Sequence, residues 1–197
     1  MKLLIAVPSV EYIHYKFAES LNRLTRALDD EQVNYNVAFE SGSLVYLERD
    51  NLVKHAANGD FTHILWLDAD MVFPDTIAYD LMLDDLPFVS AMCVSRHKNY
   101  RTVLFDDLKK SHRFDEIPDE IFEIEGCGMA CCFMESKIPI DIMNHEGTCF
   151  CPTPRYGEDL AFCEKVLKYG YKMYADPNVK VGHIGHVVLY PGSQEPI

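Results

Sequence analysis

A short apolar run that ends in two acids, at residues 64–70, constrains the fold of this chain more than any other stretch. Residues 64–67 are aliphatic or aromatic and predict a strand buried on both faces. Open α/β sheets bind ligands at the carboxyl ends of their strands, which is where Asp68 and Asp70 follow this one. Side chains two residues apart on an extended backbone point the same way, so both carboxylates are expected to face one object. Their repulsion favours a bound cation with hard oxygen ligands, Mg²⁺ or Mn²⁺, whose open positions would carry phosphate oxygens.

This strand is the third in a series that alternates with helices. Pro8 and Ser9 are predicted to stop the first strand, and Phe17, Leu21 and Leu24 recur at helical spacing in the segment that follows. Repeated strand–helix units are typical of an α/β fold with a mostly parallel central sheet and helices on both faces. The predicted strands are residues 2–7, 33–39, 64–67 and 88–94, and the predicted helices are 15–28, 44–58 and 75–83.

The second half of the chain is less regular. Residues 96–119 mix basic and acidic side chains without a period, which predicts a long polar loop, either a lid or a disordered segment. The tail from Pro191 onward is expected to fray. The other predicted elements are short strands at 121–125 and 129–134 around Gly126-Cys127-Gly128, a helix at 157–169, and strands at 171–175 and 179–183.

The composition narrows the function. A chain of 197 residues that is 48% apolar suits a single domain, expected at 1–190 with a tail at 191–197. The net charge of −13 argues against a nucleic-acid surface, and it makes a cation more necessary if the ligand is anionic. No apolar stretch reaches membrane length, and the first one is too short for a signal peptide. An odd number of cysteines, seven, then favours a reduced, cytoplasmic protein.

Two further motifs carry groups that can do chemistry. Glu158 and Asp159 follow Gly157 at the predicted start of a helix, where acids serve either as ordinary caps or as a base presented to a cleft. His183 lies among small residues near a strand end, either as a core or surface residue or as a nitrogen ligand of a metal beside Asp70. A histidine that shares the chain with two acidic motifs favours the ligand interpretation.

Four stretches, in this order along the chain, resemble the motifs of glycosyltransferases with the GT-A fold, in a small bacterial or phage form. Residues 66–74 (WLDADMVFP) resemble the DXD region, and residues 46–51 (YLERDN) resemble the helix with an Arg near an Asn that precedes it and helps to hold the nucleotide. Residues 157–162 (GEDLAF) resemble the ED motif of inverting members, and residues 181–185 (VGHIG) resemble the late histidine that joins the metal.

The resemblance covers most of the chain, from Lys2 to His186. It implies a single GT-A-like (Rossmann-like) domain, with a nucleotide-binding half at 1–95 and an acceptor and metal half at 120–190. It also implies that Asp70 binds the metal directly, that Asp68 contacts the ribose or the metal's water shell, and that His183 is the third protein ligand.

The same resemblance places the nucleotide. The spacing after Arg49 leaves open whether Asp50 or Asn51 faces the ligand. Gly126 and Gly128 would let the backbone approach the sugar or acceptor. The residues implied beside the nucleoside or diphosphate are Pro8, Ser9, Arg49 and Asn51, with Glu11 as a weaker candidate.

The implied activity is a metal-dependent sugar transfer from a nucleotide-diphosphate donor, a UDP- or GDP-sugar, to a hydroxyl of a glycan or other acceptor. Asp159 would be the base that deprotonates the acceptor, with Glu158 in support. Attack on the face of the sugar opposite the diphosphate gives inversion, and Mn²⁺ or Mg²⁺ would neutralise the leaving diphosphate.

Other interpretations of the same residues remain open. In a phosphatase of the haloacid dehalogenase type, Asp68 would be a nucleophile and Asp70 an acid or base, but that motif normally follows the first strand of the fold. A non-catalytic nucleotide-sugar- or metal-binding protein would keep the acids without turnover. A zinc site is a further alternative, although thiols buried in strands fit the cysteine spacing better. Its candidate ligands are Cys127, Cys131, Cys132, His145, Cys149 and Cys151.

Overall fold

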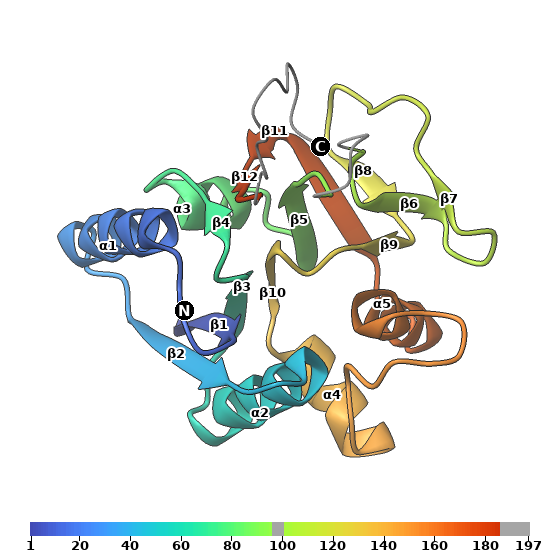
Figure 1. Cartoon of the computed structure of the whole chain (residues 1–197), viewed down its shortest axis with the longest axis horizontal. Coiled ribbons are helices and arrows are strands. Elements are labelled where there is room, and N and C mark those ends of the chain that lie inside the picture. Colours follow the sequence, from blue (N-terminus) through green and yellow to red (C-terminus); the bar gives the residue numbers. More distant parts are fainter. Residues whose placement is uncertain (96–100, 186–197) are drawn as a thin grey trace, which may run out of the picture.

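The structure, a computed structural model, describes residues 1–95 and 101–185 (Figure 1). His186, the segment 96–100 and the tail 191–197 lie outside the described residues. The first half consists of β1 Leu3–Ser9, α1 Tyr15–Asp30, β2 Tyr35–Ser41, α2 Val45–Asn58, β3 His63–Leu67, β4 Met71–Val72, α3 Ile77–Met82 and β5 Phe88–Met92. The second half consists of β6 Leu104–Asp107, β7 His112–Arg113, β8 Phe122–Ile124, β9 Gly126–Cys127, β10 Cys131–Glu135, α4 Lys137–Glu146, α5 Glu158–Lys168, β11 Met173–Lys180 and β12 Gly182–His183.

A seven-stranded sheet with the order β2-β1-β3-β10-β5-β11-β8 forms the centre of the molecule. Strands β1, β2 and β3 are parallel to one another, and β5 is parallel to β11. Strand β10 is antiparallel to both β3 and β5, so these two run in the same direction. Five strands therefore share one direction and only β10 and β8 oppose it, which confirms the predicted mostly parallel α/β sheet.

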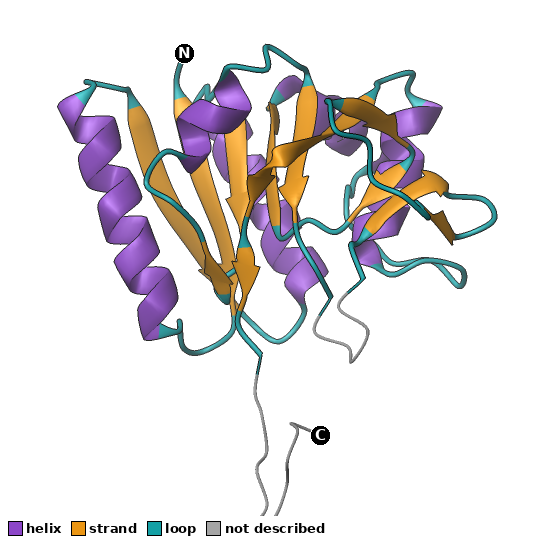
Figure 2. Cartoon of the chain, turned by 90° about the horizontal axis from the view of Figure 1, so that it is seen from above, coloured by secondary structure: helices purple, strands orange, loops and turns teal. Residues whose placement is uncertain are grey.

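Helices cover both faces of this sheet, as predicted (Figures 1 and 2). One apolar core lies under α1 and α3 and contains Phe17 and Leu81. The other lies under α2, α4 and α5 and contains Trp66, whose ring packs at 5.4 Å from that of Phe150. Burying large apolar side chains on both faces supplies the main driving force for this fold.

Two small sheets complete the fold at the carboxyl edge of the large one. Strand β12 pairs with β4, and His183 lies opposite Met71 in that register. Strands β7, β6 and β9 form the other small sheet. The prediction of an unstructured polar loop over 96–119 is wrong for its described part, because Leu104, Phe105 and Leu108 are buried. Two apolar residues in a strand of four are too few to give a detectable period.

Several element boundaries differ from the predictions. Strand β1 continues through Pro8 and Ser9, which pair with β2. On its other side β1 pairs with β3 only as far as Ala6, so the missing N–H of Pro8 is tolerated at a position with one free side. The two strands predicted at 171–175 and 179–183 are one strand, β11, with an irregular register after Asp176, followed by the short β12. Helix α4 was not predicted, because it contains Pro139, and proline usually interrupts a helix except in the first turn, where Pro139 lies. Among the described residues, no helix has both the length and the apolar character needed to span a membrane.

Candidate functional site

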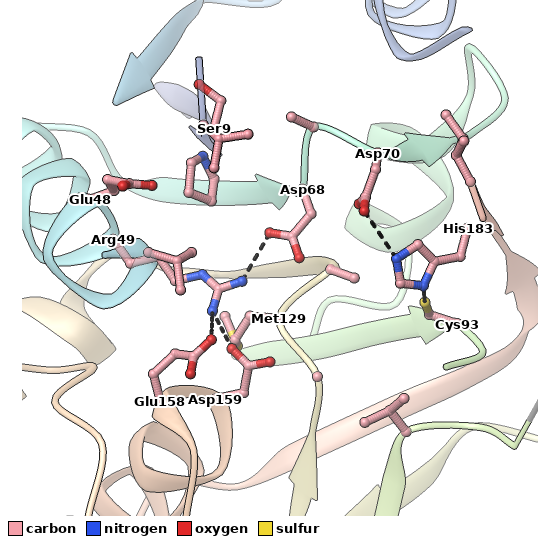
Figure 3. A pocket seen from close by; sticks show the side chains of 18 of the residues that line it. Ser9, Glu48, Arg49, Asp68, Asp70, Cys93, Met129, Glu158, Asp159 and His183 are labelled. Atoms are coloured by element: carbon pink, nitrogen blue, oxygen red, sulfur yellow. Dashed lines mark hydrogen bonds and ion pairs between the residues drawn. The ribbon is translucent and has the colours of Figure 1, made fainter. Parts of the chain in front are cut away.

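A cleft of about 910 Å³ opens where β1, β3 and β5 end, at the carboxyl edge of the sheet (Figure 3). Its walls carry five acidic side chains and one arginine, with apolar residues between them. The acids are Glu48, Asp68, Asp70, Glu158 and Asp159. Residues that the sequence places far apart are brought to one cleft, at the position where open α/β sheets bind their ligands.

Asp68 and Asp70 point to different sides of this cleft (Figure 3). Strand β3 ends at Leu67, and the chain then turns, with the Met71 N–H donating to the carbonyl of Asp68 at 3.1 Å. The alternation of an extended strand does not apply within a turn, so the expectation that both carboxylates face one object is wrong for this structure. Each acid has a different partner instead.

Asp70 contacts His183. The pairing of β12 with β4 brings His183 Nε2 to 3.3 Å from Asp70 Oδ2. His183 Nδ1 lies 2.9 Å from the carbonyl oxygen of Val94, which can only accept, so Nδ1 carries a proton. Hydrogen bonds with Asp70 and Cys93 raise the pKa of His183 to about 10.

This pair suits a cation. With a pKa of about 10, His183 also carries a proton on Nε2 when no cation is bound, and a cation beside Asp70 would take the place of that proton. Donation of Nδ1–H to a backbone carbonyl is the usual outer-shell arrangement at metal sites. An imidazole nitrogen beside a carboxylate oxygen fits Mn²⁺ well and Mg²⁺ less well. The third expected ligand, Asp68, does not join them. Within residues 1–95 and 101–185, no three His, Cys, Asp or Glu side chains are arranged to hold a metal ion.

Asp68 pairs with Arg49 at 2.9 Å. The other end of the same guanidinium contacts Asp159, and Glu158 at 3.4 Å, both in the first turn of α5. Only 2% of Arg49 is exposed. Burial alone would lower the pKa of Arg49, but the negative charges of Asp159, Asp68 and Glu158 have the larger combined effect and raise it. Burial and the charge of Asp159 raise the pKa of Asp68 to about 6, against the lowering effect of Arg49.

The remaining predicted residues divide into two groups. Pro8 and Ser9 line the cleft, and so does Gly128, whereas Gly126 packs against Leu108 and Leu160. Glu11 is exposed and does not line the cleft.

Asp50 and Asn51 are not brought to the cleft. Asn51 is exposed on α2 and its side-chain oxygen lies 3.4 Å from Lys54 Nζ. Two residues along a helix is a rotation of about 200°, so Asn51 points away from the side that carries Arg49. Asp50 is buried and accepts hydrogen bonds from the backbone of Cys149 at 2.8 Å and Phe150 at 3.1 Å.

Some cleft residues were not singled out by the sequence. Val103 and Met129 form an apolar wall near Asp159, and Cys93 lies 4.0 Å from His183. Nothing in their local sequence distinguishes them from core residues. All seven cysteines are unpaired and five are buried, which supports the interpretation as thiols in the core over a zinc site.

Comparisons with known proteins bear on the fold. No protein family matches the sequence, and no curated protein is similar to it. Among solved structures, A197 from STIV is 18% identical with a TM-score of 0.58, and the match covers 93% of this chain and 86% of that one.

Two enzymes share the architecture. The catalytic domain of Drosophila β1,4-galactosyltransferase 7, solved with xylobiose, is 10% identical with a TM-score of 0.56 and coverages of 94% and 72%. Apo UDP-glucose pyrophosphorylase is 9% identical with a TM-score of 0.55 and coverages of 92% and 91%. The predicted GT-A-like fold class is confirmed by these matches.

Proposed function

We propose that this protein transfers a sugar from a nucleotide-diphosphate donor to an acceptor hydroxyl, with a divalent cation as cofactor. The observation that carries the proposal is the cleft itself. It places the Asp70–His183 pair on one wall and Asp159 on another, at the carboxyl edge of a sheet shared with a galactosyltransferase and a nucleotide-sugar pyrophosphorylase. The enzymes in those comparisons are named for sugar transfer and for nucleotide-sugar chemistry, which supports a nucleotide sugar as donor.

The structure offers residues that would hold the cation and a cleft whose negative charge makes a cation necessary for an anionic donor. Asp70 and His183 would hold it, while Asp68 would stay paired with Arg49. The cleft carries five acids against Arg49, which is already paired with acids, so an anionic diphosphate needs added positive charge to enter. Bound there, Mn²⁺ or Mg²⁺ would stabilise the negative charge of the leaving diphosphate.

The protein's own residues account for the other half of the reaction. Asp159 would accept the proton of the acceptor hydroxyl on a carboxylate oxygen. The hydroxyl oxygen would attack the anomeric carbon as the bond from that carbon to the diphosphate breaks. The Oδ1 atom of Asp159 contacts Arg49. Its Oδ2 lies near Gly128, and a Cβ atom at position 128 would lie 3.8 Å from this oxygen. The lack of a side chain at Gly128 keeps space beside this oxygen, and attack from this wall of the cleft, with the diphosphate on the other, would invert the anomeric centre.

A turnover assay tests the proposal. Purified protein is incubated with UDP-glucose, UDP-galactose or GDP-mannose and Mn²⁺, with and without simple glycosides, and released UDP or GDP is measured. The proposal requires release from at least one donor that is abolished by EDTA and by Asp70→Ala. Asp75→Ala is the matched control, because Asp75 follows the same strand but is exposed and outside the cleft. A protein that binds these donors without releasing nucleotide would be a nucleotide-sugar-binding protein.

A further inference from the structure

Arg49 occupies an unusual place for a charged residue. It lies on α2 at positions three, four and seven before the core residues Leu52, Val53 and Ala56, so it shares their inward-facing side. Its side chain is only 2% exposed, and its guanidinium carbon lies 5.7 Å from the ring centre of Phe150. Burying a guanidinium among apolar side chains is costly unless its charge is matched by partners.

Those partners come from two separate parts of the cleft (Figure 3). Nη2 donates to Asp68, on the turn after β3, at 2.9 Å. Nη1 donates to Asp159 and, at 3.4 Å, to Glu158, in the first turn of α5. One rigid, planar group therefore joins the candidate base to the turn after β3 that also carries Asp70, which is the donor side of the cleft in the proposed function.

These contacts leave Arg49 poorly placed to bind a diphosphate, the role implied by the resemblance. Both terminal nitrogens already donate to carboxylates, and Nε is buried without a partner among the described residues. A phosphate would have to compete with three carboxylates for a guanidinium that is only 2% exposed.

We infer that Arg49 is a positioning residue, which fixes the Asp159 carboxylate relative to the donor side of the cleft through its simultaneous contact with Asp68. This inference rests on the proposed function, because it assigns Arg49 a role in the same reaction. The planar fork of arginine can contact two carboxylates in fixed directions, whereas lysine offers a single nitrogen. Misplacing a reacting group by about 1 Å can lower the rate by about 100-fold.

The test is a kinetic double-mutant cycle with Arg49→Lys and Asp159→Asn. Hydrolysis of UDP-glucose, UDP-galactose and GDP-mannose with Mn²⁺ is measured for each variant, and kcat and KM are obtained separately. Arg49→Lys is expected to lower kcat by about 10- to 100-fold and to change the donor KM less than threefold. In the Asp159→Asn background the same change should lower kcat less than threefold, since the base that Arg49 positions is already lost.

Controls separate this role from general stability. Lys165 on α5 is a cation with 14% exposure that donates to the Thr148 carbonyl at 2.7 Å, outside the cleft. Lys165→Met should reduce thermal stability without a change in kcat at a temperature where the variant is folded. Arg49→Gln, which can still donate to one carboxylate, is the second variant if Arg49→Lys does not fold.

Each other outcome overturns the inference. Equal losses of kcat in both backgrounds would show that Arg49 acts independently of Asp159. A raised donor KM with unchanged kcat would make Arg49 a donor-binding residue. Failure of both Arg49 variants to fold, with a folded Lys165→Met, would make its role structural. A wild-type protein that turns over none of the three donors would refute the proposed function, and the positioning role with it.

Discussion

His183 Nε2 lies 3.3 Å from Asp70 Oδ2, although 113 positions separate the two residues in the sequence. The contact depends on two very short strands, β4 and β12, which pair at the carboxyl edge of the main sheet. Met71 of β4 is fully buried in the core, and its pairing with His183 of β12 brings an imidazole and a carboxylate together on one wall of the cleft. The first prediction follows from this contact.

Mn²⁺ should stabilise the protein against heat. A ligand at 100 times its Kd adds about 2.7 kcal/mol, which corresponds to a rise in Tm of about 5 to 10 °C for a chain of this size. The rise should be larger when UDP or GDP is also present. Asp70→Ala should remove it and Asp75→Ala should retain it, as measured by differential scanning fluorimetry. An unchanged Mn²⁺ effect in Asp70→Ala would place the cation elsewhere.

Asp50→Ala should destabilise the fold by about 3 kcal/mol, measured by urea unfolding. The carboxylate is buried and accepts from the Thr148 hydroxyl and from two backbone N–H groups, and these donors would be left unsatisfied. The neighbouring Asn51→Ala provides the control, because this side chain is exposed and should change stability by less than about 0.5 kcal/mol. Comparable effects of the two substitutions would contradict the arrangement described for α2.

The structure also predicts a pH dependence at Asp84. Burial, with the negative charge of Asp176, raises the pKa of Asp84 to about 6, and no donor among the described residues reaches its Oδ2. Between about pH 4 and pH 6 the folded state keeps a proton that the unfolded chain has lost, so this group costs stability as pH rises through that range.

Asp84→Asn should therefore stabilise the protein by about 1 kcal/mol at pH 7.5, after allowance for the partial exposure of the group. The gain should disappear near pH 4, where Asp84 is protonated in the folded state. Urea unfolding of both proteins at the two pH values measures it. A gain that is the same at both pH values would show that the carboxylate charge is not the cause.

Most of the sheet and the larger helices could be predicted from the sequence. Strand β3 is a continuous apolar run, and the helices that cover the sheet early in the chain show clear periods. The helical periodicity of α2 also indicates that Arg49 is buried, since its spacing to Leu52, Val53 and Ala56 places it on the same side of the helix. The same spacing places Asn51 on the exposed side.

Other features depend on tertiary structure and leave no local trace. The turn after Leu67 separates Asp68 from Asp70, and its geometry depends on the Asp68 N–H donating to the carbonyl of Ala130 at 3.0 Å. The pairing that brings His183 to Asp70 could not be predicted from periodicity, because a strand of two residues has no detectable period. Strand β6 was hidden among charged residues for the same reason.

The most direct test of the proposed function is the turnover of Asp159→Asn. Asparagine keeps the size of the side chain, and its amide oxygen can still accept from Arg49, which also keeps Asp68 and Glu158 as partners, so the variant should fold and bind Mn²⁺ and nucleotide like the wild type. Turnover should nevertheless fall by about 100- to 10,000-fold, the usual contribution of a general base. Measured release of UDP or GDP from the preferred donor, with binding verified in the same preparation, gives the answer. Near-normal turnover in this variant would contradict the role of Asp159 and the inverting mechanism built on it.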